Sequence, residues 1–260
     1  MSALPESGPG AETRAVAAAA LGSTLVGTVP YFAVGLYKSG MDVASVLLWR
    51  YWLALAVLIP LALWTSPGLR TEWAAAGRGL FLNALTLGAA QTYTYFRAVQ
   101  TVPSSVVITV FLVYPIITLA LDRYLLALSV RWPSILAAGL IFLGALLAGS
   151  PSLSLGNADT VGILCLLATP LLYAVYIGIA YRFTRRGSPF ASASAIYLGL
   201  GCAYAAMVGL LGIRLPAGSG EWQSLIAIAL LGEQLTPLQL AGIGLVAVGV
   251  VADRLVRTRR

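Results

Sequence analysis

The sequence predicts an all-α, polytopic membrane protein, and three observations support this fold class. Of the 260 residues, 59% are apolar and only 10% are charged, whereas ordinary soluble domains carry about 25% charged residues. The mean hydropathy is +0.89. Apolar residues form runs of about 20, the length of a helix that crosses the hydrocarbon core of a bilayer. Such long, uniform runs indicate helices rather than barrel strands, since a helix satisfies its own backbone hydrogen bonds.

The apolar runs predict about eight full membrane spans, joined by short turns of Gly, Pro and Ser. The spans are residues 15–36, 42–64, 79–100, 104–126, 132–150, 160–181, 190–213 and 236–254. A polar tail, 1–14, precedes them and is expected to be disordered and cytoplasmic. It lacks the charged start and cleavage site of a signal peptide, so the first span is expected to be retained. A basic tail, 255–260, follows the last span.

The distribution of Lys and Arg predicts the orientation, because cytoplasmic loops carry an excess of both. With a cytoplasmic N-terminus, 12 of the 16 basic residues fall inside, and only Lys38, Arg97 and Arg214 fall near the outer side. Eight spans then place both termini in the cytoplasm of a multi-pass inner-membrane protein. The net charge of +7 is therefore a topology signal. Nucleic acid is not an expected partner, because the basic residues are divided among separate loops.

The sequence lacks the residue patterns that are typical of catalytic and metal-binding sites. The chain contains no histidine, the commonest general base and metal ligand. Its two cysteines, Cys165 and Cys202, lie in apolar runs and suit neither a disulfide framework nor a metal site. No phosphate-binding loop or nucleophile motif occurs. We expect no enzymatic activity, no cofactor and no metal; the expected partners are the lipid bilayer and a small-molecule solute.

The two halves of the chain share a weak internal repeat. A run that follows a turn occurs early in each half, at 42–54 and at 189–197. A helix with glycines five apart occurs late in each half, with Gly139 and Gly144 in the first and Gly244 and Gly249 in the second. Weak internal repeats of this kind are typical of secondary transporters.

Four short motifs, in order along the chain, resemble a known family. They are Arg50 followed by Ala54 and Ala56; Tyr95-Phe96-Arg97-Ala98; Val113-Tyr114-Pro115; and the Gly-Glu step within residues 231–242, which is the most specific. With them, the whole chain resembles the EamA-like carriers of the drug/metabolite transporter superfamily. The resemblance implies two inverted five-helix repeats, 15–150 and 160–254, around a central substrate cavity.

The second repeat is shortened relative to the pattern of that family. The stretch from Trp222 to Gly244 is about 44 residues shorter than the corresponding stretch from Trp73 to Gly139. This shortfall equals about two spans, and the apolar remnant 225–231 is too short to cross. Two alternatives stay open: a working eight-helix carrier, with a homodimer as one way to close its cavity, and a non-transporting membrane subunit or truncated, inactive carrier fragment.

Polar and aromatic residues within the spans are the candidate substrate-binding residues. Arg50 lies about eight residues into its span, where a charge is costly and is expected to face the bundle interior. Its alternative is a snorkelling side chain. Gln91 and Tyr95 share one helical face, with interhelical hydrogen bonding as the alternative. Aromatic candidates that could stack on a solute are Tyr114, Tyr173 and Tyr176, for which lipid-facing or packing roles are the alternative.

Three prolines and one acid are the candidate hinge or gating residues. Pro30, Pro115 and Pro170 are expected to kink their spans, because proline removes a backbone donor. Glu233 precedes Thr236 and Pro237, which predict the start of the last helix. The predicted function is alternating-access transport of small polar metabolites or amino-acid-like solutes. The direction of transport, its coupling to protons and the identity of the solute are not encoded in these patterns.

Overall fold

The structure, a computed structural model, describes residues 29–65, 71, 73, 77–124, 132–149, 158–184 and 189–230. Within these ranges the secondary structure is helical and contains no strand, as predicted. After a helical segment at 29–38 come α2 (Val43–Thr65), α4 (Arg78–Asn83), the π-helix η2 (Ala84–Gly88), α5 (Ala89–Thr101), α6 (Ser104–Phe111), α7 (Tyr114–Tyr124), α8 (Trp132–Gly149), α9 (Thr160–Thr184), α10 (Pro189–Leu211) and α11 (Ser219–Leu230).

Four segments of the described chain are long and apolar enough to cross a membrane: Val43–Pro60, Ser104–Leu121, Thr160–Phe183 and Ala191–Leu211. They coincide with four of the predicted spans. The predicted span 132–150 is the helix α8, whose apolar part is the shorter Trp132–Gly144. The span 236–254 and most of 15–36 lie outside the described residues. The number of eight spans and the inverted repeats therefore stay predictions.

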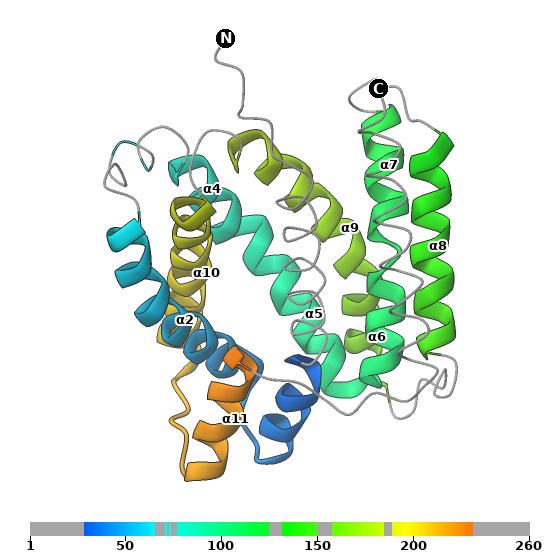
Figure 1. Ribbon diagram of the computed structural model, residues 1–260. Coiled ribbons are helices and arrows are strands. Elements are labelled where there is room, and N and C mark those ends of the chain that lie inside the picture. The colour runs from blue at the N-terminus through cyan, green and yellow to red at the C-terminus, as the bar shows by residue number, and fades with distance from the viewer. Residues whose placement is uncertain are drawn as a thin grey trace.

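The predicted third span is one continuous helix made of α4, η2 and α5. The residues at both junctions, Asn83 and Gly88, keep α-helical dihedral angles. Figure 1 shows this helix running obliquely through the middle of the bundle, with α2 and α10 on one side and α6, α7 and α8 on the other. It contacts both α9 and α10. Short π-helical segments inside α-helices are frequent at functional sites. The π-helix therefore favours a functional site along this central helix.

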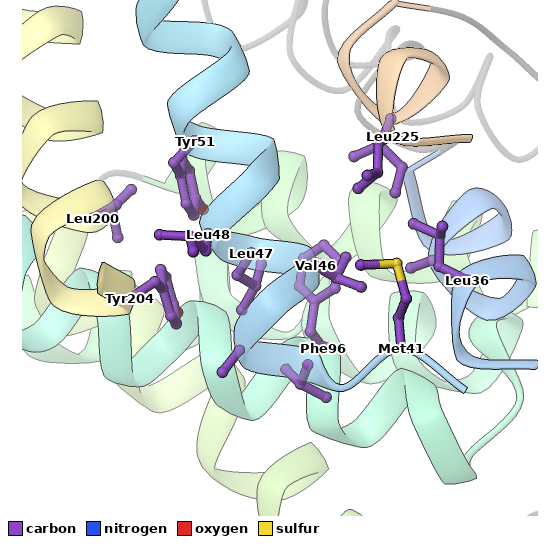
Figure 2. Packing of buried hydrophobic residues seen from close by; sticks show 14 of the residues in the cluster. Leu36, Met41, Val46, Leu47, Leu48, Tyr51, Phe96, Leu200, Tyr204 and Leu225 are labelled. Atoms are coloured by element: carbon purple, nitrogen blue, oxygen red, sulfur yellow. The ribbon is translucent and has the colours of Figure 1, made fainter. Parts of the chain in front are cut away.

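The core lies where α2 and α10 pack against the central helix. Tyr51 of α2 and Tyr204 of α10 stack with their ring centroids 5.7 Å apart and their planes 6° apart. Leu47 and Phe96 are buried in the same cluster (Figure 2). The Tyr204 hydroxyl donates a hydrogen bond of 2.7 Å to the Ala89 carbonyl, just after the π-helix. These contacts fix α10 to both α2 and α5.

The fourth predicted span is broken in the middle. α6 ends at Phe111, a turn covers Leu112 and Val113, and α7 begins at Tyr114. Pro115 therefore occupies the first turn of a new helix, where no amide hydrogen is needed, rather than kinking a continuous one. Pro170, in contrast, lies inside the continuous helix α9. Pro30 stands at the start of the described residues, and Glu233 lies outside them.

Small residues allow the helices to approach closely. At Gly199 of α10, an added Cβ would stand 2.5 Å from the Phe81 carbonyl oxygen and 3.0 Å from the Cβ of Ala84. The backbone of α10 therefore lies directly against α4 and η2. Membrane bundles rely on such contacts because water-driven burial does not hold helices together in lipid.

Substituting Gly199→Ala should lower the stability of the purified protein by about 1–3 kcal/mol, because the methyl group would force the two backbones apart. The measurement is thermal unfolding in detergent. Gly178→Ala is the matched control: it also lies within a helix, but no neighbouring atom lies within 4 Å of its Cβ position, so equal or slightly higher stability is expected. Equal stability of both variants would contradict the close approach.

Candidate solute-binding site

Arg50 is partly buried on α2 and faces aromatic rings of the bundle. Its Cζ atom lies 5.2 Å from the centroid of the Phe96 ring and 5.4 Å from that of Tyr51. At such distances an aromatic face attracts a cation. The rings of Tyr37 and Tyr95 pack against the cluster of buried residues that contains Tyr51 and Phe96. No carboxylate within the described part of the chain pairs with Arg50.

The Tyr37 hydroxyl is buried and has no hydrogen-bond partner among the described residues. Its ring packs at the junction of two clusters of buried residues, as does that of Tyr95. A buried hydroxyl without a partner is costly, and native structures normally satisfy such groups. This hydroxyl therefore points to a ligand or a water molecule beside Arg50.

An aromatic series extends from Arg50 across the bundle. It runs from Phe96 to Tyr95 (5.6 Å between ring centroids), to Phe111 (5.4 Å), and then to Tyr173 (4.9 Å). Tyr114 lies 4.7 Å from Tyr173. The side chains come from α5, α6, α7 and α9, so the fold gathers rings that are far apart in the sequence. Phe111 lies four residues before Pro115. In a continuous α-helix its carbonyl would accept a hydrogen bond from residue 115, but proline has no amide hydrogen.

Tyr176 continues this series towards the π-helix. Its ring centroid lies 6.2 Å from that of Tyr173. Its ring edge packs so closely over the last residue of η2 that a Cβ at Gly88 would stand 3.0 Å from it. The Tyr176 carbonyl accepts a 3.0 Å hydrogen bond from the Asn83 side chain. α9 is thus held against the central helix on both sides of the π-helical turn.

Gln91 lies in a hydrogen-bonded group between α2 and α5. Its side chain is 8% exposed, and its Oε1 atom lies 3.3 Å from the hydroxyl oxygen of Thr92, the next residue of the same helix. The Tyr51 hydroxyl of α2 lies 3.5 Å from the same Thr92 oxygen. The contact between the two helices is therefore made by Tyr51 and Thr92, and both roles predicted for Gln91 stay predictions.

Arg97 closes one end of the bundle. Its guanidinium forms an ion pair with Asp159, which precedes α9. The Asp159 carboxylate also accepts a 2.8 Å hydrogen bond from the Gly162 amide and a 2.9 Å hydrogen bond from the Thr101 hydroxyl. The Gly162 amide, the Thr101 hydroxyl and then Arg97 hold the pKa of Asp159 below its usual value. Arg97, which the sequence predicts at the outer boundary of the membrane, thus links the end of α5 to the start of α9.

Arg214 forms a second link at this end. It follows α10, and its guanidinium donates to the carbonyl groups of Gly40 and Ser39. Its own backbone amide donates to the Ser45 hydroxyl at 3.0 Å, and its carbonyl accepts from the Trp49 indole at 3.3 Å. Gly40 has a φ of +89°, which favours glycine. The turn before α2 is therefore attached to the end of α10.

The structure connects Arg50, Tyr95, Tyr114, Tyr173 and Tyr176 through one series of aromatic contacts, with Gln91 one turn from Tyr95. Four residues next to them are not among the predicted ones: Tyr51, Phe96 and Phe111, which make ring contacts, and Tyr37, which packs against the same buried cluster. In the sequence, Tyr51 directly follows Arg50 and Phe96 directly follows Tyr95. This adjacency to predicted residues is the sequence signal that identifies them. Nothing local in the sequence marks Tyr37. In the described residues no group of three His, Cys, Asp or Glu side chains could hold a metal ion.

Residues 13–150 match the EamA-like transporter family, which is more than half of the chain. The chain belongs to this family. Together with the apolar helices, the match makes it a multi-pass membrane protein of the transporter type, as the sequence motifs predicted. The comparison with curated proteins gives no match. A protein crystal structure aligns with a TM-score of 0.57 at 16% identity, covering 90% of this chain and 84% of that one; the likeness concerns the fold alone.

Substituting Asp159→Asn should lower the melting temperature near pH 7 and weaken its acid dependence. A carboxyl whose pKa is lowered by folding stabilises the protein above its unfolded pKa, for which the usual value is 3.8. This stabilisation is lost as the pH falls through the folded pKa. Melting temperatures between pH 7 and pH 3 should therefore differ most above about pH 4 and converge below it.

Thr101→Val keeps the Asp159 carboxylate and removes one of its donors, so this variant should show a smaller loss with the same pH dependence. A difference between Asp159→Asn and the wild type that stays constant over the whole pH range would contradict the assignment.

Proposed function

We propose that this EamA-like protein carries a small polar solute, such as a metabolite or an amino-acid-like compound, through the membrane by alternating access. The observation that supports this proposal most strongly is Arg50. Its charge lies within a span, against the rings of Tyr51 and Phe96, and no described carboxylate neutralises it. A charged residue inside a membrane segment is expensive and is a functional-site candidate for that reason.

The aromatic series and the two links at the bundle end suit such a carrier. Tyr95, Phe111 and Tyr173 offer ring faces beside the charge. We infer that Arg97–Asp159 and Arg214–Gly40 act as gate contacts, since each joins a helix of the first repeat to one of the predicted second repeat. Opening this end would require both to separate.

We also propose an inner-membrane location with both termini in the cytoplasm. Arg97 and Arg214, two of the three basic residues predicted outside, contact segments that the same topology puts outside: Asp159 and the turn at Ser39 and Gly40. This agreement supports the relative sidedness of the predicted loops. Pairing of two copies in the membrane would complete a cavity that the shortened second repeat leaves open.

The non-transporting subunit is the second candidate, and α11 favours it. The described part of this helix, Ser219–Leu230, has 12 residues and is therefore about 18 Å long, against about 30 Å for the hydrocarbon core. This described part is shorter than a span, which agrees with the shortened second repeat that the sequence predicts.

Transport by the purified protein in liposomes distinguishes these candidates. We expect saturable counterflow of at least one solute in a panel of amino acids, acetylated amino acids, nucleosides and sugars. Arg50→Ala should reduce that counterflow at least tenfold, because the charged contact is removed, while expression stays close to normal.

Arg182→Ala is the control for this measurement, since Arg182 lies exposed in the last turn of α9; transport by this variant should be unchanged. Full counterflow by Arg50→Ala would overturn the site. No counterflow of any solute by a folded wild-type protein would favour the subunit.

A further inference from the structure

Arg50 forms no ion pair among the described residues. The acid that precedes it in the sequence is Asp42, directly before α2. Its carboxylate accepts a 2.9 Å hydrogen bond from the Ser45 amide. This is the capping contact at the start of α2. Asp42 is also exposed. The acid therefore serves the helix end and does not neutralise the guanidinium.

The two contacts of Arg50 with aromatic rings leave its hydrogen-bonding edge available. Cation–π contacts with Phe96 and Tyr51 use the faces of those rings. A guanidinium donates its hydrogen bonds in its own plane, and two parallel donors match the two oxygens of a carboxylate. Holding such a charge within a span without a partner is unfavourable. An anionic group on the solute would supply that partner.

Tyr37 is an independent indication of the same ligand. Its buried hydroxyl has no hydrogen-bond partner among the described residues. Its ring packs against the cluster of buried residues that contains Tyr51 and Phe96, the two rings that contact Arg50. A phenol hydroxyl is a good donor to an anionic oxygen. Tyr95 packs against the same cluster, and its ring contacts that of Phe96.

The amount of charge favours one class of anion. Among the described residues, Arg50 is the one cation that contacts the rings of Tyr51 and Phe96. A single positive charge neutralises a carboxylate, whereas a phosphate group carries between one and two negative charges at neutral pH. The rings that continue from Tyr95 to Phe111 and Tyr114 offer an apolar surface next to the charge.

We propose that Arg50 and Tyr37 form a carboxylate subsite, and that the solute is an organic monocarboxylate whose apolar body lies along Tyr95, Phe111 and Tyr114. The proposal rests on the transport function above and adds the chemical class of its solute. It also assigns Tyr37 as a solute-binding residue.

Binding to the purified full-length protein tests this subsite. The probes are 3-phenylpropionate, its neutral amide 3-phenylpropionamide, and phenyl phosphate, measured at pH 7.5 by titration calorimetry. We expect the carboxylate to bind at least tenfold more tightly than the amide and the phosphate. Arg50→Gln should weaken carboxylate binding by about tenfold to a hundredfold, and Tyr37→Phe by about twofold to tenfold. Both variants should weaken the binding of the amide less than that of the carboxylate, because the amide oxygen accepts hydrogen bonds but carries no charge.

Two matched controls separate local effects from misfolding. Tyr31→Phe removes an exposed hydroxyl from the same helical segment as Tyr37, and Arg182→Gln removes an exposed arginine; both should bind the carboxylate as the wild type does. Tyr37→Phe removes a single oxygen atom, so it provides a test even if Arg50→Gln fails to fold.

The outcomes distinguish the subsite from the transport function. Equal binding of carboxylate and amide, or an unchanged carboxylate affinity in Tyr37→Phe and Arg50→Gln, would overturn the subsite, and counterflow of any other solute would leave the transport function standing. Tighter binding of phenyl phosphate would overturn the carboxylate assignment in the same way. Absence of both probe binding and counterflow in a folded protein would overturn both proposals.

Discussion

The structure depends on one constraint: within lipid, no water is available to satisfy polar groups of the backbone. The helices meet it by themselves, and their hydroxyl side chains follow the same rule. Thr86, Thr92, Thr118 and Thr169 each donate to the carbonyl one turn earlier in their own helix. Deviations from regular helix occur where other side chains compensate. At the π-helix, the Tyr204 hydroxyl bonds the Ala89 carbonyl, and Asn83 reaches across to α9.

The arginine side chains of the bundle differ in their partners according to where they lie. Arg97 and Arg214 lie at one end of the bundle, where the first pairs with Asp159 and the second bonds the carbonyls of the turn before α2. Both bind protein groups and hold helix ends together. Arg50 is different, since it lies against two aromatic rings and no described carboxylate neutralises it. The charge without a polar protein partner lies within a span, and the two charges with such partners lie at the end of the bundle.

The aromatic series connects this charge to the elements that interrupt the helices. Phe111 and Tyr114 flank the break between α6 and α7, and Tyr176 packs over the last turn of the π-helix. Both interruptions of the helices therefore contact the aromatic series that leads to Arg50 through Tyr95 and Phe96. In the proposed carrier, a solute bound along this series would favour one arrangement of these helices over another, and binding would in this way be coupled to a change of shape.

The sequence by itself determined the all-helical membrane fold, four of the spans that the structure describes, and the family. These features follow from composition and from the length of apolar runs, which are local properties. It also pointed to Arg50, Tyr95, Tyr114, Tyr173 and Tyr176, because charged and aromatic residues stand out within apolar runs. Tertiary structure alone decided which of them meet. Tyr37 packs against the cluster that contains Tyr51 and Phe96, and Phe111 joins Tyr95 to Tyr173 because helices far apart in the chain pack side by side. Proline marks the break at Pro115 in the sequence, whereas no local pattern marks the π-helix.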